Sequence, residues 1–191
     1  MPSLRAILKL LWVRWCGVSV AMVLLMPCMA QAQIETQTVE YQVKAAFLYK
    51  FAAYVEWPAQ TFDRADSPFV IAVFNADSFA DTLEQTTSGR RVNGHPFEIR
   101  RLHRGTSAAG AQILFVPRAA TPSDALTLAK GQATLIVTEV EPGASNSGMI
   151  NFVLADDKVR FDITPSVAEQ SNLKISARLL GVARKVIGRT S

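Results

Sequence analysis

The chain has 191 residues, of which 49% are hydrophobic and 19% are charged, with a formal net charge of +4. This composition fits one globular domain with a sizeable core. No repeat, low-complexity tract or long linker divides the sequence.

The first 32 residues have the three-part layout of a secretory signal peptide. They contain no acidic residue and three basic ones, Arg5, Lys9 and Arg14. An apolar run over 18–29 follows, and Ala30-Gln31-Ala32 forms a small-x-small cleavage pattern. We predict cleavage after Ala32 and a periplasmic protein. The alternative is an uncleaved membrane anchor, for which the apolar run is short against the roughly 20 residues of a span.

Loss of residues 1–32 changes both the charge and the cysteine content. It removes three of the 20 basic residues and none of the 16 acidic ones, which leaves a net charge of +1. A nearly neutral domain has no electrostatic footprint for nucleic acid. Both cysteines, Cys16 and Cys28, are also removed, so the mature chain is predicted to have no disulfide, thiolate metal site or cysteine nucleophile.

The mature chain opens with an apolar segment that predicts a helix. Apolar residues recur at every fourth position, at Val39, Val43, Phe47, Phe51 and Val55. Pro58 biases Trp57 out of the helical region and ends the helix there. Lys44 and Lys50 flank the apolar face with their ammonium groups in water. The segment is too short and too polar to span a bilayer and lacks a strongly cationic face, which predicts a buried helix and no membrane insertion.

The remaining segments predict an α/β fold. Continuous apolar runs indicate buried strands at 69–74, 112–116 and 133–138, and alternation indicates a half-exposed strand at 97–102. Helices are expected at 75–87, 122–130, 165–170 and 175–187, a hairpin at 149–154 and 159–163, a basic turn at 89–94 and a small-residue loop at 143–148. Together they predict a single layered domain, a mixed β-sheet of about six strands flanked by helices.

Known catalytic patterns are missing from the sequence. Gly-x-Ser-x-Gly does not occur, and Ser171-Asn-Leu-Lys174 matches Ser-x-x-Lys without a Lys-Thr-Gly partner. His95 and His103 are not in a metal-protease spacing and are expected at the surface. We therefore predict a binding protein that is not an enzyme and has no cofactor and no metal site.

One basic concentration stands out, formed by Arg90, Arg91, Arg100, Arg101 and Arg104. A solvated edge balanced by acidic residues is one interpretation. The other is an anion-binding or partner-facing patch, because Arg makes bidentate contacts to carboxylates and phosphates.

Several segments of the mature chain stand in a characteristic order. The most specific is YQVKAAFLYKFAAYVEWP at 41–58, directly after the signal peptide. It is followed in order by FVIAVF (69–74), VNGHP (92–96), ILFV (113–116), TLIVT (134–138), GMINFV (148–153), VRFDI (159–163) and LKISARLL (173–180). In this order the segments resemble the YfiR family of periplasmic proteins, and the resemblance covers nearly all of the mature chain.

The resemblance implies a periplasmic repressor that acts by binding other proteins. The target would be the periplasmic domain of an inner-membrane diguanylate cyclase (YfiN-like), whose inhibition lowers cyclic di-GMP and biofilm formation. An outer-membrane lipoprotein (YfiB-like) and a second copy of the chain are further partners that it implies. The family's disulfides and redox response have no counterpart here, because the mature chain has no cysteine.

Two other functions remain open at this point, a small-ligand sensor for a membrane histidine kinase or other receptor and a hydrolase of the cell envelope. For contacts with a partner or ligand, we predict Trp57 as an anchor at a helix end with Lys50 beside it. Asn151 and Arg178, polar groups within apolar segments, and Arg90, Arg91 and Arg101 complete the set. Each has a structural alternative: Trp57 could cover the core, and Asn151 and Arg178 could lie on outward faces.

Overall fold

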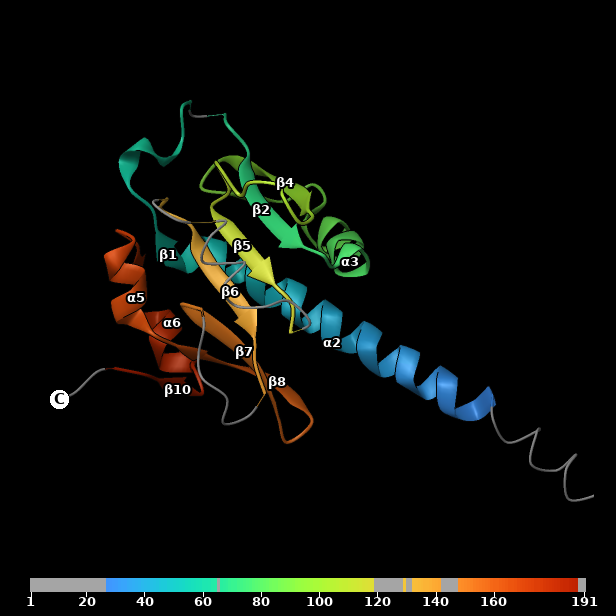
Figure 1. Ribbon diagram of the computed structural model, residues 1–191. Helices are drawn as coiled ribbons and strands as arrows, with labels where there is room; N and C mark the ends of the chain where they lie inside the picture. The colour runs from blue at the N-terminus through green and yellow to red at the C-terminus, as the bar shows by residue number, and fades with distance from the viewer. Residues whose placement is uncertain (1–26, 65, 119–128, 130–131, 142–147, 189–191) are drawn as a thin grey trace, which may run out of the picture. The chain divides into compact units, whose positions relative to one another are not determined.

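The computed structural model describes residues 27–64, 66–118, 129, 132–141 and 148–188 (Figure 1). The chain divides into two units, residues 1–40 and 41–191. Helix α2, Pro27–Tyr54, begins in the first unit and ends in the second. The predicted cleavage site after Ala32 falls within the first turns of α2. Among the described residues, no helix is both long and apolar enough to cross a membrane.

The second unit is built on one mixed sheet with the strand order β10-β8-β7-β6-β5-β2-β4-β3. Its strands are β2 (Phe69–Phe74), β3 (Arg91–Val92), β4 (His95–Leu102), β5 (Ile113–Val116), β6 (Leu135–Glu139), β7 (Ile150–Ala155), β8 (Lys158–Ile163) and β10 (Lys185–Val186). Strands β4, β2, β5, β6 and β7 are parallel, β8 and β3 run antiparallel to their neighbours β7 and β4, and β10 is parallel to β8. Strands β1 (Val55–Glu56) and β9 (Lys174–Ile175) pair separately.

The prediction of an α/β domain with a mixed sheet is confirmed. The described helices besides α2 are α3 (Asp77–Thr87), α5 (Pro165–Gln170), α6 (Ala177–Val182) and the 3-10 turn η1 (Ala59–Thr61). Within the described residues, the sheet has eight strands rather than about six, because the prediction missed β3 and β10, which are two residues long and show no hydrophobic period. Most of the helix expected at 122–130 and most of the loop at 143–148 lie outside the described residues.

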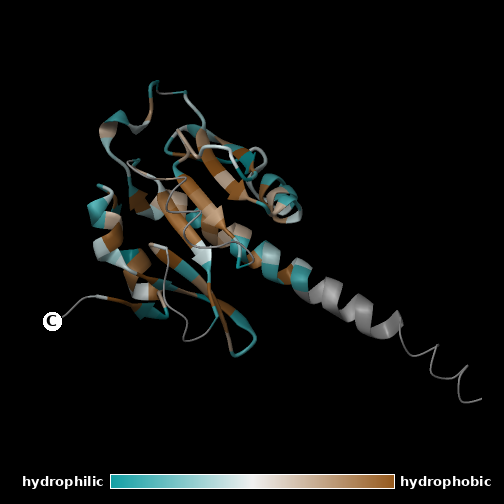
Figure 2. Ribbon diagram, in the orientation of Figure 1, coloured by the Kyte–Doolittle hydropathy of each residue, from teal (hydrophilic) through white to brown (hydrophobic). Residues whose placement is uncertain are grey.

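Helices α2 and α3 pack on the sheet through aromatic rings. The ring centroid of Phe51 of α2 lies 5.8 Å from that of Phe152 and 5.1 Å from that of Phe161. Phe152 and Phe161 face each other across the β7–β8 hairpin. Phe79 of α3 lies 4.4 Å from Phe115 of β5. All residues of β2 and β5 are buried, as their continuous apolar runs predict, and these strands form the hydrophobic centre in Figure 2.

The buried face of α2 differs from the predicted one. The residues at zero exposure are Ala45, Leu48, Phe51 and Ala52, whereas Val39 and Val43 are 58% and 38% exposed. Lys44, expected with its ammonium in water, is buried, and its Nζ donates to Glu139 Oε1 at 2.8 Å. The ion pair with the partly buried Glu139 on β6 thus accounts for the burial of Lys44. The helix ends at Tyr54, because Val55 and Glu56 pair with β9.

The predicted helix over 175–187 is confirmed only over Ala177–Val182, which form α6, and both ends of the predicted range are wrong. Ile175 belongs to β9, α6 ends at Val182, and Lys185–Val186 form the edge strand β10. The Arg184 guanidinium donates to both carboxylate oxygens of the buried Asp162, and the Arg184 and Ile187 amides donate to β8 carbonyls. The hydrogen bonds to Asp162 also raise the pKa of Arg184. The β8 residues that hold this segment are distant from it in the sequence, so local periodicity did not reveal strand β10.

Candidate binding surface

Trp57 is held against the sheet at the point where the chain leaves β1. Its indole N–H donates to the carbonyl oxygen of Gln112 at 3.3 Å. Its ring meets Phe69 edge-on, with 5.0 Å between the ring centroids. The side chain is half-buried. Trp57 is therefore fixed by the start of β5 and by β2, rather than standing at the end of a helix as predicted.

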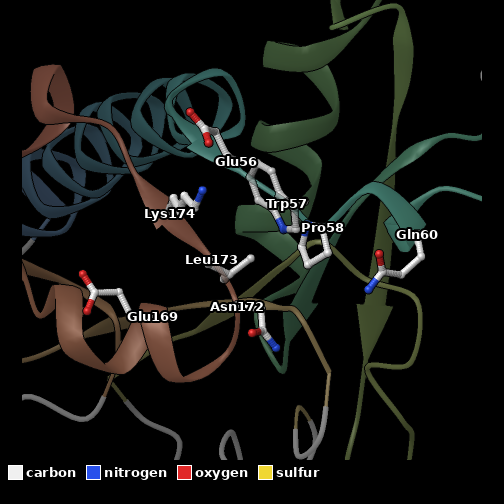
Figure 3. A pocket seen from close by; sticks show the side chains of 8 residues that line it. All are labelled: Glu56, Trp57, Pro58, Gln60, Glu169, Asn172, Leu173 and Lys174. Atoms are coloured by element: carbon white, nitrogen blue, oxygen red, sulfur yellow. The ribbon is translucent and has the colours of Figure 1, made fainter.

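A cleft of about 570 Å³ opens beside Trp57 (Figure 3). One wall comes from the segment after α2 and the other from the end of α5 and β9. Figure 3 shows Trp57 and Pro58 between Glu56 and Gln60, with Leu173 pointing toward them from the opposite wall. The lining residues are Glu56, Trp57, Pro58, Gln60, Glu169, Asn172, Leu173 and Lys174.

A sharp turn after α5 brings the second wall into place. Asn172 has φ of 57°, a left-handed conformation that Asn tolerates better than most residues. The Leu173 amide then donates to the Ala168 carbonyl oxygen at 2.9 Å, and the Leu173 side chain is fully buried. Strand β9 follows at once and pairs Lys174 with Glu56 of β1. The β1–β9 pairing thus determines which residues face each other across the cleft.

A second cleft of about 350 Å³ lies on another side of Trp57 and is rich in aromatic residues. Tyr54, Phe62, Phe69 and His95 line it together with Trp57. The His95 ring stacks on Phe62 at 3.9 Å, and its Nδ1 lies 2.7 Å from the Ser67 carbonyl oxygen. Because a carbonyl oxygen only accepts, Nδ1 carries a proton. The interaction orders the loop between η1 and β2 against the start of β4.

The two clefts share Glu56, Trp57 and Pro58 and form a continuous region, which we call the Trp57 surface. Its polar groups include carboxylates, side-chain amides, hydroxyls, one ammonium and one imidazole. In the part of the chain that the structure describes, no group of three or more His, Cys, Asp or Glu residues could hold a metal ion. His103, the other histidine, is exposed after β4. The arrangement offers shape, aromatic area and hydrogen bonds, which suit recognition.

The arginine cluster is divided among different roles. Arg101 donates to Asp81 and Glu84 of α3, each at 2.5 Å. The hydrogen bonds to Glu84 and then to Asp81 raise the pKa of Arg101. Arg100 pairs with Glu98 of its own strand at 3.2 Å. Arg90 instead lies over the ring of Tyr49, 5.1 Å from its centroid, and the Arg91 guanidinium donates to the Gly94 carbonyl oxygen at 2.7 Å.

Asn151, Lys50 and Arg178 do not line either cleft. Asn151 is fully buried in β7, accepts from Thr138 Oγ1 and the Gly148 amide, and donates to the Gly148 carbonyl oxygen. These contacts are internal to the domain. Lys50 on α2 and Arg178 on α6 are exposed. A contact role for these residues stays a prediction.

Several lining residues were missed by sequence reasoning, namely Gln60, Phe62, Glu169 and Asn172. Each is an ordinary residue for its own segment, in a turn or a short helix. Their proximity depends on the pairing of β1 with β9, which joins segments more than 100 residues apart. No local pattern carries that information.

Comparison with known proteins gives one family. Residues 41–184 match a family model described as YfiR/HmsC-like. The matched range begins in α2 and includes every residue that lines the two clefts. The curated proteins contain no significant match to this chain.

Proposed function

Because the chain belongs to the YfiR/HmsC-like family, we propose that it inhibits an inner-membrane diguanylate cyclase from the periplasm. Inhibition would lower cyclic di-GMP and biofilm formation. The family indicates a periplasmic regulator of diguanylate cyclase signalling. Export with cleavage after Ala32, the inhibitory direction and the absence of catalysis by this chain are parts of the proposal.

The Trp57 surface is the observation that supports a binding role. An aromatic ring fixed by neighbouring groups loses little conformational freedom when a partner packs on it. Tryptophan is also among the residues that most often dominate the energy of protein interfaces. With a cleft on each of two sides, Trp57 offers adjoining recesses for side chains of the cyclase's periplasmic domain.

Binding alone is sufficient to regulate an enzyme across the membrane. If the chain binds one state of the periplasmic domain more tightly, it shifts the cyclase toward that state. A coupling free energy of about 1–3 kcal/mol changes the balance roughly 5- to 150-fold. Control of this chain itself would come from competition, through an outer-membrane lipoprotein or a second copy of the chain.

A small-ligand sensor is the second candidate. The aromatic second cleft favours it, because about 350 Å³ lies within the range of small-molecule sites. Such a protein would carry a bound ligand after purification, and its membrane receptor would be a histidine kinase or another signalling protein. A ligand-free protein that binds the cyclase domain directly would favour the inhibitor instead.

The inhibitory role is tested by deleting the gene and measuring cellular cyclic di-GMP. We expect a rise on deletion, because an inhibited cyclase would be released, and a return to the original level when the full-length gene is restored. A gene that lacks residues 1–32 is the matched control and should not restore the level, since its product stays in the cytoplasm. Unchanged cyclic di-GMP in cells that normally make the protein would count against inhibition.

A further inference from the structure

A third cleft, of about 330 Å³, lies between the end of α3 and strand β4 and shares no lining residue with the Trp57 surface. Arg90 and Arg91 line it together with Ser88 and Gly89, which follow α3. Phe97 and Ile99 of β4 also line it, with Pro96. The cleft therefore combines cationic groups with an apolar wall.

The two arginines are held in position without acidic partners among the described residues. The Arg90 guanidinium lies over the Tyr49 ring, and Phe97 packs beside the same ring at 5.5 Å. Arg91 donates to Gly94, which belongs to the tight Asn93-Gly94 turn between β3 and β4. Asn93 and Gly94 have φ of 49° and 88°, typical of a rigid type I′ hairpin turn. Neutral contacts thus order both side chains while leaving their charges uncompensated.

The acidic residue of the cleft is already neutralised. Glu84 lines the cleft and accepts from Arg101 Nη1 at 2.5 Å, while Asp81 accepts from Nη2 of the same guanidinium. Arg90 and Arg91 therefore give the mouth of the cleft a net positive charge. A guanidinium fork matches the paired oxygens of a carboxylate or a phosphate. The apolar wall of Phe97 and Ile99 favours a carboxylate that carries an apolar body.

We propose that this cleft binds a small organic acid, with its carboxylate on Arg90 and Arg91 and its apolar body against Phe97 and Ile99. The volume lies at the lower end of the range for small-molecule sites, which limits the ligand to a compact molecule. A ligand here would contact the end of α3 and the β3–β4 hairpin together. The site goes beyond the proposed inhibition and does not depend on it.

The test is titration of the purified, processed protein with sodium hexanoate, followed by the amide NMR signals of Gly89 and Gly94. We expect saturable shifts of these signals in the millimolar range. Acetate, which has the carboxylate but almost no apolar body, and hexanamide, which has the apolar body but no charge, should each bind at least tenfold more weakly. The double variant Arg90→Gln/Arg91→Gln should lose the hexanoate response. Arg160→Gln, at an exposed arginine of β8, should keep it.

Two results would overturn the proposal. Equal responses to acetate and hexanoate would show a general anion effect in which Phe97 and Ile99 take no part. Hexanoate shifts that persist in the double variant would place the carboxylate elsewhere. Because the three probes are compared on the unchanged protein, the first result does not depend on how well the variant folds.

Discussion

Replacing Lys44 by alanine is expected to lower the free energy of unfolding by about 3–5 kcal/mol, the usual cost of breaking a buried ion pair by removing one partner. The side chains of Lys44 and Glu139 are 5% and 11% exposed, and Nζ lies 2.8 Å from Oε1. Without Lys44, the Glu139 carboxylate stays largely out of water with only the Arg118 amide, at 3.2 Å, as a described donor. Urea denaturation measures the loss.

Two further variants separate the ion pair from general effects on α2. Lys50→Ala, at an exposed position of the same helix, should change stability by no more than about 0.5 kcal/mol. The double variant Lys44→Met/Glu139→Leu should recover much of the loss, because apolar side chains often replace a buried pair at little cost. If Lys44→Ala costs no more than Lys50→Ala, the buried pair does not stabilise the domain as described.

Asn151→Leu is expected to cost about 3 kcal/mol, because it leaves both the amide and the carbonyl oxygen of Gly148 without their side-chain partner, each at about 1–3 kcal/mol. Gly148 is buried, and its amide lies 2.9 Å from Asn151 Oδ1. A Cβ at position 148 would meet the Ile136 carbonyl oxygen at 2.9 Å, so the backbone here is closely packed. Thermal and urea unfolding of the variant give the value.

Thr138→Val is the matched comparison for Asn151. It removes one donor to Asn151 Oδ1 and leaves the Gly148 bonds, so the expected loss is smaller, about 1 kcal/mol. These two changes also separate a structural role for Asn151 from a contact role. An Asn151→Leu protein with unchanged stability and lost regulation would contradict the structural role and favour the contact.

The elements that could be predicted are those whose burial shows in the apolar pattern of consecutive residues. Strand β2, with six buried apolar residues, and the β7–β8 hairpin were predicted nearly to the residue. Edge strand β10 was not, because its two residues are defined by the partner strand and by the Arg184–Asp162 contact. The predicted buried face of α2 was wrong in part for the same kind of reason, because Lys44 is buried against Glu139, an acid 95 positions away.

The candidate site was predictable only in part. Trp57 was expected as a contact residue from its place at a helix end. It lines two clefts, and its contact role stays a prediction. The facing wall, with Glu169 and Asn172, could not be predicted, because it is brought there by long-range strand pairing. The arginines form one group in the sequence, but the structure separates them. Carboxylates of α3 bind Arg101, whereas Arg90 and Arg91 line the third cleft.

We propose that the chain regulates its partner through the Trp57 surface. The decisive test restores the deleted gene with Gln60→Arg/Glu169→Arg, which adds bulk and positive charge at two exposed residues of the first cleft. Lys158→Glu, at the exposed start of β8 in the hairpin, is the control. Cellular cyclic di-GMP is measured at matched protein levels. We predict that the cleft variant leaves cyclic di-GMP as high as in the deletion, while the control lowers it. A cleft variant that lowers cyclic di-GMP as fully as the unchanged gene would show that regulation does not pass through the Trp57 surface.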